Sequence, residues 1–247
     1  MKGTWRDLRR AVKLLPAITT TDVQEQEPRV AVLPIGSYEQ HGAHLPLITD
    51  TAIACIIARE IAAAYPVLQL PPVTIACSHE HGTWAGTVSI SARTLHAMVN
   101  DIAASLEASG VRKLVLVNAH GGNYVLSNIV QEANLTESRM TLFPQGREWN
   151  RSRERAGLVS DAHGDMHAGE IETSILLHAE PSLVRDGYET ADHDGGGRPF
   201  LLTHGMKAYT ETGVIGFPSY ATAEKGKSVL ASLVEDFAAH LEALGEE

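Results

Sequence analysis

The chain has 247 residues, a formal net charge of −10 and 44% hydrophobic residues. A chain of this length can bury a sizeable core without cross-links, and its two cysteines, Cys55 and Cys77, exclude a disulfide framework or a cysteine-rich zinc site. The acidic balance argues against a nucleic-acid partner, because phosphate contacts need a basic face.

The N-terminal segment carries a basic cluster that includes Arg6, Arg9 and Arg10, on a predicted helix with Trp5 and Leu8. It lacks the apolar stretch and small residues of a secretory signal. No apolar run in the chain reaches membrane-spanning length. We therefore interpret the cluster as a solvated helix face and expect a cytoplasmic protein without a membrane partner.

Apolar runs alternate with helical patterns along the rest of the chain, which is typical of βα units around a mainly parallel sheet. The predicted strands span residues 29–35, 67–76, 113–117 and 140–143. The predicted helices span residues 50–65, 94–109, 124–135, 167–177 and 223–244. Residues 186–217 show little periodicity and indicate a loop, a lid or a subunit contact. We expect one domain, residues 1–247, with an α/β fold: a three-layer α/β/α sandwich.

Residues 36–50 follow the first predicted strand, where α/β sheets place their ligands. Glu39 and His41 are two positions apart, so an extended segment presents both on one side. Asp50 lies near a helix start, where a carboxylate is favoured. These side chains suit zinc, manganese or iron(II). The alternative is a capped turn, with Asp50 as the N-cap and His41 bonded to the backbone.

Three further segments carry candidate residues. His120 lies in the glycine-rich turn NAHGGN directly after a predicted strand; a plain turn or a phosphate cradle is the alternative. His167 opens a predicted helix that also bears Glu170 and Glu172, and both glutamates could simply be surface residues. Glu80 and His81 stand beside Trp84, which could line a pocket or belong to the core.

In this order and spacing, the segments resemble the creatininase family of metal-dependent amidohydrolases. The match covers about residues 30–240. Its motifs are GSYEQHG with HLPL and TD at residues 36–50, Glu80-His81, Gly86-Thr87, NAHGGN, His167-Ala168-Gly169 with Glu172-Thr173-Ser174, Gly213-Val214-Ile215-Gly216 and Ala223-Glu224-Lys225-Gly226.

The resemblance implies two divalent metal ions per subunit, Zn²⁺, Mn²⁺ or Fe²⁺. Glu39, Asp50 and His120 would bind one, and His41, Asp50 and a further carboxylate the other. In creatininases proper that carboxylate follows the histidine of the NAHGGN-type turn by two residues. Here Gly122 occupies that position, and Glu172 is the expected substitute, with Glu170 as its competitor. Met166 and Phe217 also depart from the pattern of many relatives and speak against creatinine as substrate.

The resemblance further implies a homo-oligomer, often a hexamer, with a small-molecule amide as substrate. We expect hydrolysis of a non-peptide C–N bond, in an amide, formamide or cyclic amide, by a hydroxide bridging the metals. His167 would protonate the leaving nitrogen, and Glu80 joins it among the candidate catalytic residues.

Several alternatives stay open. The substrate could be a formylaminopyrimidine nucleotide, with Arg147, Arg151, Arg153 and Arg155 as a phosphate-binding cluster, although a solvated face explains that cluster better. It could instead be a peptide, as in a creatininase-type peptidase. A one-metal hydrolase and a metal-stabilised binding protein without turnover are the remaining hypotheses.

Overall fold

A parallel sheet of four strands forms the centre of the computed structural model, which describes residues 14–246. The strands stand in the order β2-β1-β3-β4. Their bounds are Val30–Ile35 (β1), Val67–Gln69 (β2), Lys113–Asn118 (β3) and Met140–Phe143 (β4). β1 and β3 read VAVLPI and KLVLVN, which are the near-continuous apolar runs typical of strands buried on both faces.

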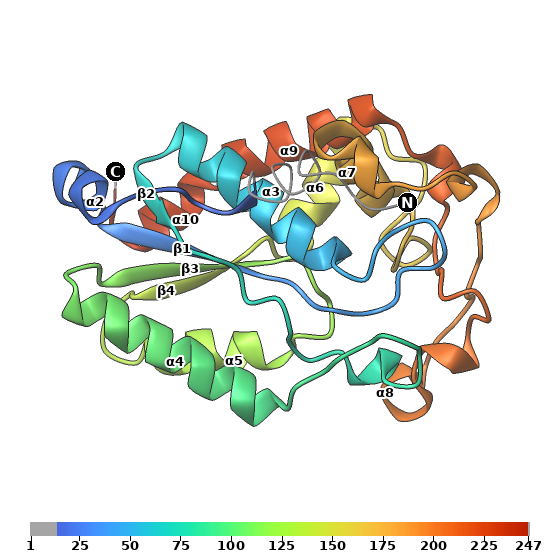
Figure 1. Ribbon diagram of the computed structural model, residues 1–247, viewed down its shortest axis with the longest axis horizontal. Coiled ribbons are helices and arrows are strands. Elements are labelled where there is room, and N and C mark those ends of the chain that lie inside the picture. Colours follow the sequence, from blue (N-terminus) through green and yellow to red (C-terminus); the bar gives the residue numbers. More distant parts are fainter. Residues whose placement is uncertain (1–13, 247) are drawn as a thin grey trace, which may run out of the picture.

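Helices cover both faces of this sheet (Figure 1). One face carries α4 (Ala92–Ala108) and α5 (Val125–Ala133). The other carries α3 (Thr49–Ala64), α6 (Gly146–Ala156), α7 (Glu170–Ala179), α9 (Ala223–Asp236) and α10 (Ala238–Ala243). The shorter helices are α2 (Thr20–Gln26), α8 (Leu201–His204) and 3₁₀ turns at His79–His81, Pro181–Leu183, Tyr188–Thr190, Met206–Ala208 and Pro218–Tyr220. The predicted three-layer α/β/α sandwich is confirmed.

Successive side chains of each strand point to opposite faces, so the sheet builds two apolar cores. In β1, Ala31, Leu33 and Ile35 pack with the residues of α4 and α5. Val30 and Val32 pack with those of α3, α7 and α9. Between these cores the sheet is a rigid support, and the segments that leave its carboxyl edge carry the candidate site.

Some predicted elements differ from the structure. The strand predicted at residues 67–76 ends at Gln69, because Pro71 and Pro72 have no N–H to donate to the sheet. The helix predicted at residues 167–177 begins only at Glu170. The helix predicted at residues 223–244 divides at Phe237 into α9 and α10. Helix α6 was not predicted, because its residues were interpreted only as an arginine cluster.

The basic cluster at Arg6, Arg9 and Arg10 lies outside the described residues, so its predicted helix stays a prediction, as does the single-domain organisation. Within residues 14–246, no helix combines the length and apolar character needed to cross a bilayer.

Candidate metal centre

Four segments meet beyond the carboxyl ends of β1 and β3, and each brings candidate metal ligands. Glu39 and His41 come from the segment after β1, and Asp50 comes from the first turn of α3. His120 follows β3 directly, and Glu172 lies in the first turn of α7. Two groups of these side chains have ligand atoms within 4.8 Å of one another: Glu39, Asp50 and His120, and His41, Asp50 and Glu172. The structure thus brings all five predicted ligands together, with Asp50 common to both groups.

Asp50 stands between two histidines and offers one oxygen to each. Its Oδ1 lies 2.9 Å from Nε2 of His41, and its Oδ2 lies 2.9 Å from Nδ1 of His120. The hydroxyl of Ser37 also donates to Oδ2, at 2.7 Å. This carboxylate is nearly fully buried, so its position between two nitrogen ligands is fixed by the surrounding packing.

Both histidines are oriented through their other ring nitrogen. Nδ1 of His41 lies 3.1 Å from the backbone oxygen of Glu39, and Nε2 of His120 lies 2.8 Å from that of Cys77. Because a carbonyl oxygen can only accept, these nitrogens carry the hydrogen, and Nε2 of His41 and Nδ1 of His120 are directed at Asp50. Metal-binding histidines are typically oriented in this way.

Glu39 gives the strongest indication of a cation-binding site. Its side chain is fully buried, and within residues 14–246 neither carboxylate oxygen has a hydrogen-bond partner. Nitrogens of His81 and His120 lie 3.2 and 3.3 Å away but are not aligned for a hydrogen bond. A buried carboxylate without a partner is costly. A divalent cation between Glu39, Asp50 and His120 would remove that cost, so the donor set fits a metal ion.

The pKa values of the cluster also indicate that its carboxylates are stabilised by nearby positive charge. Burial raises the pKa of Glu39 and of Glu172 to about 7, although His120 and His41 respectively oppose this. Burial acts to lower the pKa of His41 and His120, but neighbouring carboxylates, Asp50 above all for His41 and Glu39 for His120, raise both to about 10. Without metal, protons on the two imidazoles therefore supply the charge that the carboxylates require.

The two glutamates of helix α7 have different surroundings. Glu170 accepts hydrogen bonds from the backbone of Val159 and Ser160 and pairs with Lys225, whose Nζ lies 2.6 Å away. Its carboxylate is therefore committed to neighbouring segments. Glu172 instead lies with Oε1 3.9 Å from Nε2 of His41. Of the two competitors, only Glu172 reaches the centre.

The segment before α7 is held tightly, which fixes both His167 and Glu172. His167 is in extended backbone that exchanges hydrogen bonds with Ile215, of 2.8 and 3.0 Å. Ala168 has a left-handed conformation, with φ of 55°, and its N–H donates to Oε2 of Glu172 at 2.6 Å. Asp165 accepts from the first N–H groups of α7 and from Arg153, so it stabilises the helix start.

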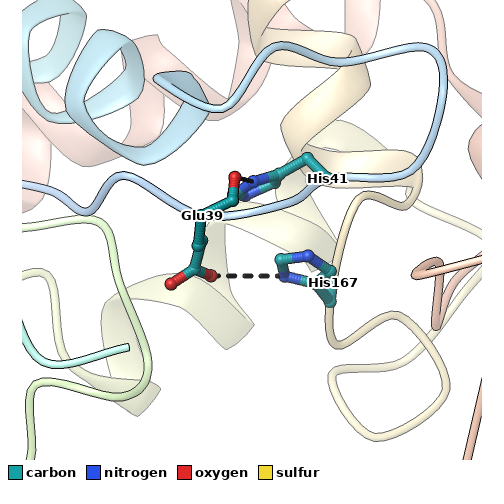
Figure 2. A group of neighbouring side chains, drawn as sticks. All are labelled: Glu39, His41 and His167. Carbon is teal, nitrogen blue, oxygen red and sulfur yellow. Dashed lines mark hydrogen bonds and ion pairs between the residues drawn. The ribbon is translucent and has the colours of Figure 1, made fainter. Parts of the chain in front are cut away.

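His167 lies against His41, with ring centroids 4.2 Å apart, and faces Glu39 (Figure 2). Its Nε2 lies 2.7 Å from the backbone oxygen of Gln40, so this nitrogen donates. Nδ1 is left with a free lone pair, 3.8 Å from Oε1 of Glu39. Burial, and then the charge of His41, hold the pKa of His167 well below its ordinary value. The arrangement presents a neutral imidazole that can take up and release a proton at Nδ1.

Glu80 lies at the rim of the cluster, with Oε1 3.5 Å from Nε2 of His120. His81 is buried beside it and forms a further possible ligand group with Glu39 and Glu80. His81 belongs to the Glu80-His81 motif but was not among the predicted ligands. No role was predicted for Gln40, whose amide Nε2 lies 3.0 Å from Nδ1 of His81 and donates to the oxygen of Gly213. The partners of this amide nitrogen lie 41 or more positions away in the sequence, so strand alternation alone could not identify them.

Each of the four arginines of α6 pairs with a carboxylate of the protein. Arg151 and Arg155 pair with Asp236 and Glu235, both at 2.6 Å, and Arg153 pairs with Asp165 at 3.0 Å. Arg147 pairs with Glu148. These ion pairs agree with the interpretation of the cluster as a solvated helix face, and the nucleotide substrate stays a hypothesis.

Comparison with known proteins adds an independent line of observation. A family model described as creatininase, creatinine amidohydrolase, matches residues 16–241. The mycofactocin precursor peptide peptidase of Mycobacterium tuberculosis (strain CDC 1551 / Oshkosh) is 36% identical over 241 residues, which cover 90% of this chain and 88% of that protein. The creatinine amidohydrolase of Pseudomonas putida is 25% identical over 243 residues, with 87% and 92% covered. The solved structure of a manganese creatininase has the same fold, with a TM-score of 0.76 at 21% identity over 98% of this chain and 96% of that one.

Proposed function

The chain belongs to the creatininase family of metal-dependent amidohydrolases, and we propose that it hydrolyses a peptide C–N bond with two divalent ions bound at the cluster around Asp50. The observation that carries this proposal is the position of Asp50 between His41 and His120. Beside it lies the carboxylate of Glu39, which has no hydrogen-bond partner among residues 14–246. Glu39, Asp50 and His120 would hold one ion, and His41, Asp50 and Glu172 the other. When bound, such ions make water a nucleophile near neutral pH and polarise a carbonyl.

The protein's own residues supply orientation and proton transfer. Nδ1 of His167 takes up the proton lost by the attacking water and delivers it to the leaving nitrogen, a contribution of about 10²–10⁴ in rate. The hydrogen bond from Nε2 of His167 to the backbone of Gln40 keeps Nδ1 available for this role. Glu80 keeps its predicted catalytic role, as a carboxylate at the edge of the site beside His120.

A peptide substrate is supported by the similarity to the mycofactocin precursor peptide peptidase, which is stronger than that to the creatinine amidohydrolase. From the sequence alone we expect a non-peptide C–N bond, with a peptide as the alternative. The comparisons favour that alternative, and the non-peptide bond stays a prediction. Cytoplasmic location and assembly into a homo-oligomer also stay predictions.

The test is a direct competition between substrate classes. The metal-loaded protein is incubated in parallel with a mycofactocin precursor peptide, with N-formyl arylamines and with creatinine, and new amines are identified by mass spectrometry. We expect cleavage of the peptide at one bond. Turnover of the formamide or of creatinine, with the peptide left intact, would contradict the proposal and restore the non-peptide alternative.

A further inference from the structure

Two segments that are distant in the sequence supply the ligands of the ion proposed between His41, Asp50 and Glu172, here called the second ion. His41 and Asp50 come from the segment that joins β1 to α3, and Glu172 comes from the first turn of α7. Oε1 of Glu172 lies 3.9 Å from Nε2 of His41. Binding of the second ion therefore depends on how these two segments are held against each other.

His44 connects the two segments. It lies in the tight turn that a bridge between His41 and Leu45 closes, and its side chain is buried. Its Nε2 lies 3.1 Å from the backbone oxygen of Ala168, which stands four positions before Glu172. Because a carbonyl oxygen can only accept, Nε2 of His44 carries a hydrogen and donates it across the gap between the segments.

Ala168 has the backbone conformation through which this contact can reach the ligand. Its φ of 55° is one that residues with a Cβ atom rarely adopt. Its N–H donates to Oε2 of Glu172 at 2.6 Å, while its oxygen accepts from His44. The N–H and the oxygen lie on either side of one Cα, so the conformation of Ala168 sets the direction of one relative to the other.

The ring of His44 directs its hydrogen bonds to the start of α7. The hydroxyl of Thr173, also in α7, lies 3.5 Å from the same Nε2. Nδ1 has no hydrogen-bond partner within residues 14–246, and a Cβ atom on Gly42 would lie only 3.4 Å from it. In the described part of the chain, the polar contacts of this imidazole are therefore those that hold the segment carrying Glu172.

We propose that His44 is a positioning residue for the second ion. Its hydrogen bond to Ala168 holds that residue in the left-handed conformation, and this keeps the carboxylate of Glu172 directed toward His41. The inference rests on the proposed two-ion site and assigns a function to a buried histidine that is not itself a ligand.

The same geometry predicts that the two ions differ in their dependence on His44. The first ion is proposed between Glu39, Asp50 and His120, and none of these comes from the α7 segment. Without the bond from His44, the second ion should therefore be bound more weakly while the first is retained. A general loss of folding would release both.

The first test compares metal binding of the parent with that of His44→Phe, which keeps an aromatic ring and removes the N–H. Metal content is measured by mass spectrometry, and titration with Co²⁺ is followed by its visible absorption. We expect about two ions per chain in the parent and about one in the variant, with affinity for the second ion lowered about 10–100-fold.

Two further variants separate positioning from a general effect of burial. His44→Gln can place an amide N–H near the position of Nε2, and it should recover most of the affinity for the second ion. His240→Phe is the matched control, because His240 is also buried but lies in α10, where it packs on Phe143 and Phe237. It should bind both ions as the parent does.

The outcomes distinguish this proposal from the proposed function. If the parent binds two ions and His44→Phe binds both as tightly, the role of His44 is wrong and the two-ion site stands. Loss of both ions together, equal losses in His240→Phe, or no recovery in His44→Gln would also contradict that role. A parent that takes up no metal would contradict the proposed function itself.

A double-mutant cycle tests whether the effect passes through Ala168. Glycine adopts a left-handed backbone readily, so a glycine at this position depends less on an external hydrogen bond. The loss of affinity for the second ion caused by His44→Phe should therefore be smaller in an Ala168→Gly background than in the parent. An equal or larger loss in that background would show that His44 does not act through the conformation of Ala168.

Discussion

The two ends of the central sheet differ in whether their charged side chains have partners. At the amino edge lies a groove of about 740 Å³ that is lined by many charged side chains. It is larger than the two cavities at the carboxyl edge, of about 390 and 350 Å³. There Glu246 pairs with Lys113 at 2.6 Å and with Arg29 at 3.2 Å. At the carboxyl edge Glu39 is buried without a hydrogen-bond partner among the described residues. A buried carboxylate without a hydrogen-bond partner, and not the size of a cavity, therefore distinguishes the candidate site from the paired charges of the amino edge.

The largest effect is expected from Asp50→Asn, which keeps the shape of the side chain and removes the charge shared by both ligand groups. Both ions should be lost or bound far more weakly, and turnover should fall by more than about 10³-fold. The matched change at the other end, Glu246→Gln, should leave metal content and turnover as they are. Metal analysis and initial rates test this pair, and equal behaviour of the two variants would remove the contrast between the ends.

His167→Ala is expected to lower kcat by about 10²–10⁴ while metal content stays the same. The proposed role of His167 is proton transfer and not metal binding, and its Nε2 donates a hydrogen bond to the backbone oxygen of Gln40. His178→Ala is the control, because His178 lies on the exposed side of the neighbouring helix α7. Full turnover in His167→Ala, or loss of metal from it, would show that the proton-transfer role is misassigned.

Glu170 and Glu172 allow the same comparison between a paired carboxylate and a ligand within one turn of α7. Glu172→Gln should lose one of the two ions, because it removes a ligand of the His41 group. Glu170→Gln should keep both but lower the free energy of unfolding by about 1–3 kcal/mol, since it weakens buried bonds to Ser160 and Lys225. Metal analysis and denaturant unfolding measure the two effects. The reverse pattern would make Glu170 the ligand.

The smallest effect is a dependence of metal affinity on pH. Without metal, Glu39 and Glu172 have a pKa of about 7, and His41 and His120 of about 10, so metal uptake near neutral pH must displace protons. Apparent affinity should weaken as the pH falls, by about tenfold per pH unit for each proton released. Calorimetry in two buffers of different ionisation enthalpy counts these protons. Uptake without proton release would contradict the assignment of these ligands.

The sequence predicted the parallel sheet and the side chains that the structure brings together beyond it, from local signals for the strands and from the family resemblance for Glu172. Buried parallel strands are continuous apolar runs, and Glu39, His41 and His120 directly follow two of them. Residues that act through tertiary contacts were not predicted. Gln40 meets His81 and Gly213, which are distant in sequence, and Asp165 is recognised as the cap of α7 only from the N–H groups that donate to it. The start of α7 was placed too early, because the bridge between His167 and Ile215 joins distant segments.

The most direct test of the metal centre is the metal content per chain of protein purified without added metal or chelator, measured by mass spectrometry for the parent and for Glu39→Gln. We expect about two divalent ions in the parent and a clear loss in the variant, because the variant lacks the buried carboxylate charge. A parent that contains no metal and takes up none on titration with Zn²⁺, Mn²⁺ or Fe²⁺ would contradict it.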